Sequence, residues 1–98
     1  MDVSYSLNGI RFIWDGNKAQ LNLQKHDGVT FEYAAQAFFD PFIRVVDASR
    51  NDEARDAIIG MANDLSLLYV VHIQIEDDQI RIISARKATR TERKHYED

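Results

Sequence analysis

The feature that most constrains the fold is a change of hydrophobic period after Pro41. Beyond this proline the chain contains four segments rich in β-branched residues, separated only by the short turns SRNDEA, NDLS and DD. The four segments span residues 43–48, 55–62, 67–76 and 79–87. Such segments favour strands, and connections this short join antiparallel neighbours. The second half of the chain is therefore predicted to form an antiparallel β-sheet.

The first forty residues predict one strand and two helices. Residues 10–14 are apolar and predict a strand, which the residues before them either join or leave frayed. Because Asp and Thr side chains accept hydrogen bonds from the free amides at a helix start, Asp15 is predicted to cap a helix that runs to about residue 26. Thr30 is predicted to cap a second helix over residues 31–40.

The C-terminal segment predicts a third helix. Thr89 and Glu92 have the T-x-x-E spacing of a capping box, which opens a helix that continues through Tyr96. A helix this short is marginal alone and must dock on the sheet. The order of elements therefore predicts a single α+β domain over residues 1–98, in which two N-terminal helices and a short C-terminal helix pack on a mostly antiparallel sheet. One face of that sheet can then remain open.

Composition bounds the class of protein. A chain of 98 residues with 45% hydrophobic and 29% charged side chains is typical of one globular domain. It contains no cysteine, which excludes disulfides and thiolate metal sites. No apolar run approaches the roughly 20 residues of a membrane span, and the first nine residues lack the features of a signal peptide. We therefore expect a cytoplasmic protein.

The charge is unevenly distributed along the chain. The net charge is -4, so the overall field would repel phosphate. Half of the 12 cations nevertheless lie in the C-terminal segment RIISARKATRTERK, with only Glu92 against them. They are Arg81, Arg86, Lys87, Arg90, Arg93 and Lys94. The segment is either a solvated helix end or a patch for a polyanion, since guanidinium groups hold phosphate with two hydrogen bonds.

Two arginines of this segment fall in the last predicted strand. Because successive side chains of a strand point to opposite faces of the sheet, simple alternation places Arg81 and Arg86 on opposite faces. A bulge or twist near Ser84 and Ala85 would re-aim one of the two.

Other residues with chemistry to offer are few. His72 lies in the apolar segment YVVHIQI and is interpreted as a core residue, with a catalytic role as the alternative. Lys25 and His26 end the first helix, where positive charge is favoured, and either cap that helix or take part in catalysis. His95 and Tyr96 either donate protons or are merely exposed. The sequence has no zinc-binding motif, glycine-rich phosphate loop or G-x-S-x-G, so no metal or cofactor site is expected.

Three stretches share their order and spacing with one known family. FIWDGNKAQLNLQKH matches the pattern W-D-x-x-K-x-x-x-N-x-x-K-H, and GVTFEYAAQAFFDP continues it. RIISARKATRTERKHYE matches the closing pattern R-I-I-S-A-R-x-A-x-x-x-E-R-x-x-Y. Over residues 12–97 the chain therefore resembles the BrnT toxins, which are ribonucleases of type II toxin-antitoxin modules with a RelE-like fold.

This resemblance implies an activity and a set of partners. The activity is metal-independent endonucleolytic cleavage of RNA, with mRNA as the expected target, which inhibits translation and growth. The protein partner is a BrnA-like antitoxin with a ribbon-helix-helix region, and operator DNA is bound only through the toxin-antitoxin complex. The family uses no cofactor, and no membrane association is implied.

Metal-free cleavage of RNA needs three kinds of group. A base takes the proton of the 2′-hydroxyl, cations hold the charge that develops on the phosphate, and an acid protonates the leaving 5′-oxygen. Arginine suits the second role because it cannot serve as an ordinary base near neutral pH. The base is either His26 or a lysine. The predicted catalytic residues are Lys25, His26, Arg55, Arg81, Arg86 and Tyr96. The three arginines are expected to bind phosphate. Lys25 and His26 are candidates for substrate contact or proton transfer, and Tyr96 for positioning or as the acid.

A competing hypothesis comes from a different class of protein. In it the chain is a non-catalytic interaction module, or an inactive toxin homologue, whose basic face binds an acidic partner protein. The negative net charge and the lack of a self-evident catalytic dyad motivate this alternative.

Overall fold

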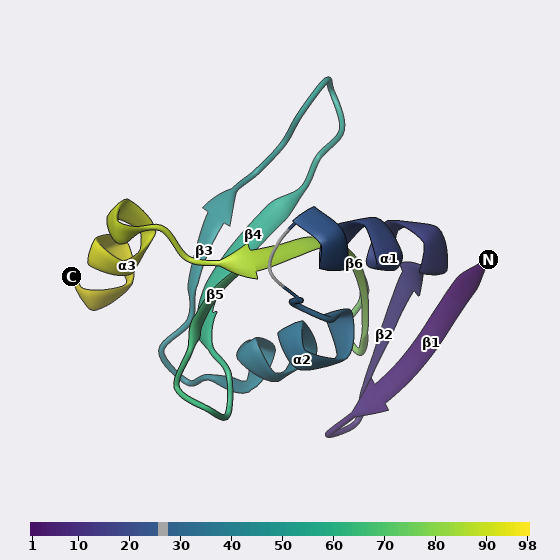
Figure 1. Ribbon diagram of the computed structural model, residues 1–98, viewed down its shortest axis with the longest axis horizontal. Coiled ribbons are helices and arrows are strands. Elements are labelled where there is room, and N and C mark those ends of the chain that lie inside the picture. Colours follow the sequence, from purple (N-terminus) through teal and green to yellow (C-terminus); the bar gives the residue numbers. More distant parts are fainter. Residues whose placement is uncertain (26–27) are drawn as a thin grey trace.

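Six strands form one sheet in the computed structural model, which describes residues 1–25 and 28–98 (Figure 1). The strands are β1 (Asp2–Leu7), β2 (Ile10–Asp15), β3 (Arg44–Asp47), β4 (Asp56–Met61), β5 (Leu67–Glu76) and β6 (Gln79–Lys87). Their order across the sheet is β1-β2-β6-β5-β4-β3. Neighbours are antiparallel except β2 and β6, which run parallel. The predicted α+β class with a mostly antiparallel sheet is confirmed.

The four strands predicted after Pro41 are all present. β5 and β6 have the predicted bounds, while β3 and β4 are one residue shorter at each end than predicted. Their β-branched composition and short turns were sufficient to define them, because each strand pairs with its neighbour in sequence.

The N-terminal hairpin differs from the prediction. Asp2–Leu7 neither joins the next strand nor frays, but forms a separate strand, β1, antiparallel to β2. Asn8 and Gly9 connect the two strands with φ angles of 51° and 82°, as a two-residue hairpin turn requires. The Asn-Gly pair was the sequence signal for this turn.

The helices begin at the predicted caps. α1 (Gly16–Lys25) follows Asp15, whose Oδ1 accepts a 2.8 Å hydrogen bond from the amide of Asn17. α2 (Phe31–Ala35) is capped by Thr30, and α3 (Arg90–Glu97) has the predicted capping box. The predicted second helix is shorter than expected, because after Ala35 it tightens into a 3-10 helix, η1 (Gln36–Phe39).

η1 rests directly on β4. A Cβ atom added to Gly60 would lie 2.5 Å from the carbonyl oxygen of Ala37 and 2.9 Å from Cγ2 of Ile43. Only glycine therefore permits this close approach. The contact fixes the end of the helical segment against the centre of β4.

The core lies between one face of the sheet and the helices α1, α2 and η1. Its largest side chains are Phe12, Trp14, Phe31, Ile58, Leu68, Val70 and Ile82. His72 belongs to this face: it is 5% exposed and its ring packs edge-on against Phe38. Burial lowers the pKa of His72, so the ring is neutral at physiological pH. Its interpretation as a core residue is confirmed.

α3 stands apart from the other helices. It lies at the end of the molecule opposite the N-terminus, beside β3 and β4 (Figure 1). Thr91, Glu92 and His95 of this helix line a hollow together with Val46, Ile59 and Tyr69. By register these three sheet residues point away from the core helices, so α3 borders the second face of the sheet. That second face is called the open face below.

Candidate functional site

A bulge in β6 brings two predicted arginines to the open face. Arg81 pairs with Ile73 of β5, and Arg86 pairs with Tyr69. Tyr69 and Ile73 lie four positions apart in β5, so they and their partners share a face. The register shifts between these pairs and leaves Ile83 as an extra residue in β6. Simple alternation, which put the two arginines on opposite faces, is therefore wrong, and the bulge that corrects it lies next to the Ser84 position considered from sequence.

Arg86 is held by two neighbours on this face. Its Nη1 and Nη2 donate to the two carboxylate oxygens of Glu92, at 2.7 and 2.8 Å. Its guanidinium carbon lies 4.3 Å from the centre of the Tyr69 ring, a cation-π contact. The hydrogen bonds to Glu92 raise the pKa of Arg86, so the side chain is a fixed cation. About a third of it stays exposed.

Arg81 is held by the first strand. Its Nη1 and Nη2 donate to the carboxylate of Asp2, at 3.1 and 3.0 Å. These hydrogen bonds lower the pKa of Asp2 and raise the pKa of Arg81. Both side chains are partly exposed, at 31% for Arg81 and 58% for Asp2, so the pair is open to exchange with another anion.

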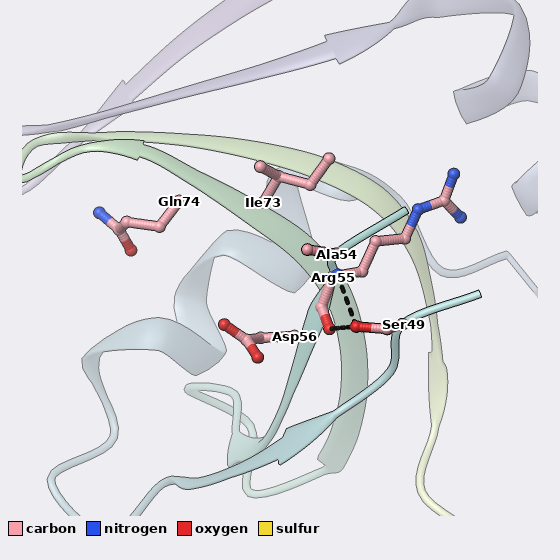
Figure 2. Close-up of a pocket in the computed structure, with 6 residues that line it drawn as sticks. All are labelled: Ser49, Ala54, Arg55, Asp56, Ile73 and Gln74. Carbon is pink, nitrogen blue, oxygen red and sulfur yellow. Dashed lines mark hydrogen bonds between the residues drawn. The ribbon is translucent and has the colours of Figure 1, made fainter. Parts of the chain in front are cut away.

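Arg55 directly precedes β4 and lines a hollow of about 210 Å³ with Ser49 and Gln74. Figure 2 shows the Ser49 hydroxyl bonded to the Arg55 backbone, with the guanidinium extending away from the carboxylate of Asp56. Nη2 of Arg55 donates to Glu53 at 2.6 Å. Nε of Arg55 is buried and, among the described residues, has no hydrogen-bond partner. This buried donor is therefore not accessible to a ligand, and any contact would have to be made by the terminal nitrogens of Arg55.

Lys25 is the last residue of α1 and is exposed. It lines a hollow beside Ile83 and Ser84, the bulged part of β6 between Arg81 and Arg86. The structure therefore places Lys25 close to the strand that bears both arginines. His26 lies outside the described residues, so its predicted role stays a prediction.

Tyr96 is not brought together with these cations. Its hydroxyl donates a 2.5 Å hydrogen bond to Oδ2 of Asp40, which also accepts from the amide of Met61. The hydrogen bond to Asp40, assisted by burial, raises the pKa of Tyr96 to about 12. This contact anchors α3 to the segment after η1, and a catalytic role for Tyr96 stays a prediction.

Asn22 was part of the matched sequence pattern but was not predicted as a site residue. It is 5% exposed, and its Nδ2 donates to the carbonyl oxygens of Val29 and Ala85, at 3.0 and 2.8 Å. Its Oδ1 accepts from the amide of Ala85 at 3.1 Å. The parallel pairing of β2 with β6 ends at Arg81, so the Asn22 amide replaces a neighbouring strand further along this edge. Asn22 thereby fixes α1 beside the bulge. A polar residue in the middle of a predicted helix was the available signal.

The elements around β6 thus define an α+β domain with one covered and one open sheet face. The open face presents fixed guanidinium groups from β6 and from the residue that precedes β4, with α1 at one border and α3 at the other. Fixed guanidinium groups on an exposed surface are suited to binding a polyanion.

Comparison with known proteins identifies the family. Residues 14–92 match the family described as the ribonuclease toxin BrnT of type II toxin-antitoxin systems, so the chain belongs to the BrnT family. The 1.1 Å crystal structure of the Brucella abortus ribonuclease toxin BrnT is similar, with a TM-score of 0.52 and 27% sequence identity. The similarity covers 79% of this chain and 94% of that one. No curated protein sequence matches the chain.

Family membership confirms the resemblance noted in the sequence. It makes the chain a member of a toxin family of type II toxin-antitoxin systems, for which a protein antitoxin is the implied partner. No helix among the described residues is long and apolar enough to cross a membrane.

Proposed function

We propose that residues 1–98 form a single BrnT-like toxin domain of RelE-like fold that cleaves RNA endonucleolytically without a metal ion. The expected target is mRNA, and the expected site of action is the cytoplasm. The observation that carries the proposal is the bulge at Ile83, which places Arg81 and Arg86 on one open face. Two fixed cations separated by a short length of strand suit successive contacts along a phosphate backbone.

The chemistry follows from the 2′-hydroxyl of RNA. Attack of the 2′-oxygen on the adjacent phosphorus forms a 2′,3′-cyclic phosphate and breaks the bond to the 5′-oxygen, which takes up a proton. Arg86 stabilises the added negative charge of the pentacovalent transition state, while Arg55 and Arg81 bind phosphate groups of the RNA. Lys25 or His26 removes the 2′-hydroxyl proton. We retain Tyr96 as a candidate for the acid, to be tested below.

The proposal is tested by incubating the purified chain with RNA in the presence of EDTA. We expect cleavage products that end in a 2′,3′-cyclic phosphate. Arg86→Ala should reduce kcat/KM by about 100-fold or more, because one positioned donor contributes roughly that much to stabilising a transition-state anion. Intact RNA with a folded wild-type chain would contradict the proposal.

A matched control separates catalysis from charge and folding. Arg93→Ala removes one cation from the exposed surface of α3 and should leave kcat within about twofold, as surface changes usually do. Thermal unfolding of each variant shows whether it is folded at the assay temperature. Equal losses of activity in Arg86→Ala and Arg93→Ala would assign the effect to overall charge rather than to Arg86.

The antitoxin is proposed to be BrnA-like, with a ribbon-helix-helix region that binds operator DNA for the complex. We propose that an acidic segment of it covers the same open face. Asp2, Glu53 and Glu92 already show that carboxylates fit Arg81, Arg55 and Arg86. Alanine at Arg81 should then weaken antitoxin binding and reduce its salt dependence. Unchanged affinity would mean that inhibition acts at another surface.

The same carboxylate contacts favour the second candidate function. If the chain is an interaction module or an inactive toxin homologue, its arginines serve only to bind an acidic partner protein. Expression without antitoxin would then be harmless to the cell. Growth arrest that is relieved by Arg86→Ala would decide for the ribonuclease.

A further inference from the structure

A second cationic surface adjoins the bulge of β6. It is a hollow of about 420 Å³ between α1, β6 and the connection from β3 to β4. Three cations, one hydroxyl, one amide and two apolar side chains line it: Lys18, Lys25, Arg50, Ser84, Asn22, Leu21 and Ile83. The name "α1 hollow" is used for this surface below. Only Lys25 among these residues was predicted as a site residue.

The backbone brings the three exposed cations of the α1 hollow to one place. Lys18 and Lys25 are seven residues apart on α1, which is two helical turns and therefore one face. Arg50 lies beside a tight turn in which Asn51 and Asp52 have φ angles of 49° and 66°. The amide of Arg50 donates to the Glu53 carbonyl at 3.0 Å, and the reverse hydrogen bond is 2.9 Å. These two hydrogen bonds fix the backbone position from which the Arg50 side chain extends.

The α1 hollow collects three cations, and among the described carboxylates Asp15 lies near enough to Lys18 to interact with its charge. Lys18, Lys25 and Arg50 form no ion pair with any described carboxylate. Like charges gathered around one concavity repel each other, and an anion that enters it relieves this repulsion. The surrounding protein carries a net charge of -4, so the local excess of cations is opposite to the overall charge.

We infer that the α1 hollow is a phosphate subsite, which binds an RNA phosphodiester next to the one that is cleaved. The inference rests on the proposed function. A cavity of this size takes a group as large as a sugar with its phosphate. Among the described residues its lining contains no aromatic side chain on which a base could stack, so we assign it to the RNA backbone rather than to sequence reading.

The position of the α1 hollow fits a continuous RNA path. Ile83 and Ser84, which line it, lie in β6 between Arg81 and Arg86. Ser84 pairs with Val71, on the same face of β5 as the partners of both arginines. A strand of RNA that follows β6 therefore meets Arg81, the α1 hollow and Arg86 in turn.

The test measures binding separately from cleavage. A fluorescent 2′-O-methyl oligonucleotide cannot be cleaved through its 2′-oxygen, so its equilibrium binding reports contacts alone. The Lys18→Ala, Arg50→Ala double variant should bind it about tenfold or more weakly. The slope of log affinity against log salt should fall by about 0.7 for each cation removed. Lys94→Ala, which removes an exposed cation of α3, should change neither quantity appreciably.

Cleavage of ordinary RNA by the same double variant completes the test. KM should rise in parallel with the loss of binding, while kcat stays within about twofold, as removal of uniform binding requires. Unchanged oligonucleotide affinity would overturn the subsite. So would a fall in kcat at constant KM, which would make the α1 hollow part of the reacting centre. Weaker antitoxin binding with unchanged RNA affinity would overturn it in favour of an acidic protein segment.

These outcomes are distinct from failure of the proposed function. A folded wild-type chain that binds the oligonucleotide but leaves RNA intact would reject the ribonuclease and leave the subsite supported by the double variant. A wild-type chain that cleaves RNA, with a double variant that binds equally well, would reject the subsite alone. A wild-type chain that does neither would reject both.

Discussion

Two groups of cations on this domain differ in how their charge is balanced. Arg55, Arg81 and Arg86 each hold a carboxylate of the same chain. The cations of the α1 hollow hold none among the described residues. The first group is oriented in advance, and phosphate must displace or share its carboxylates. In the proposed function, the second group attracts the RNA backbone and the arginines of the first group fix its position.

Asn22 holds α1, which bears two cations of the α1 hollow, beside β6, which bears Arg81 and Arg86. Removing its side chain should have the largest effect on stability. Asn22→Ala leaves the amide and carbonyl of Ala85 without partners at a buried edge. We expect a loss of about 2–4 kcal/mol in the free energy of unfolding, since each unsatisfied buried group costs about 1–3 kcal/mol. Denaturant unfolding measures it.

The control for Asn22 lies on the same helix. Gln24→Ala changes an exposed side chain of α1 and should alter stability by less than about 0.5 kcal/mol. Comparable stability of the two variants would show that the link between α1 and β6 is not important for the fold. The position of the α1 hollow beside the arginines would then need another explanation.

Glu92 tests whether the compensating carboxylates orient the arginines. Glu92→Gln removes the charge that faces Arg86 but retains an oxygen that can close the capping box, so α3 should stay folded. We expect kcat to fall by about tenfold, because a loosened guanidinium is misplaced relative to the transition state. Glu97→Gln, at an exposed position of the same helix, is the matched control. A variant with higher kcat would instead mark Glu92 as a competitor of phosphate.

The sheet was predictable because its information is local. The β-branched composition of segments 67–76 and 79–87 predicts strands, and the two-residue turn between them predicts that they pair antiparallel. The placement of Arg81 and Arg86 on one face was not predictable in this way. A bulge at Ile83 depends on how β5 and β6 fit the core, so the alternation of letters assigns the wrong face to one arginine.

The residues of the candidate site were predicted only in part, because some of them come together only when the chain folds. The family pattern pointed to Arg81, Arg86 and Lys25, which the fold does gather around β6. Arg50 was missed because it belongs to the connection between β3 and β4 and reaches α1 only through folding. The carboxylate partner of Arg81 could not be predicted either, since Asp2 lies far from Arg81 in the sequence.

The exposed pair of Asp2 and Arg81 tests whether a carboxylate of the chain competes with RNA for an arginine. Asp2→Asn removes the carboxylate that occupies Arg81, and should strengthen oligonucleotide binding by roughly 2- to 5-fold, the range of a weak surface ion pair. Asp77→Asn removes the same charge from an exposed turn and controls for the overall field. An equal gain in both variants would show that the Arg81 pair does not compete with RNA.

The smallest effect is expected at Tyr96, whose hydrogen bond to Asp40 lies apart from both groups of cations. A phenol whose pKa is raised to about 12 holds its proton more firmly than an ordinary tyrosine, so it is a poorer general acid. Tyr96→Phe should therefore keep kcat within about twofold while losing about 1 kcal/mol of stability, as loss of one hydrogen bond does. Asp40→Asn is the matched control, because its amide oxygen can still accept the hydrogen bond from the Met61 amide. A fall of about 100-fold in kcat for Tyr96→Phe, with an unchanged melting temperature, would instead assign Tyr96 to proton transfer, and would require α3 to move toward β6 when RNA binds.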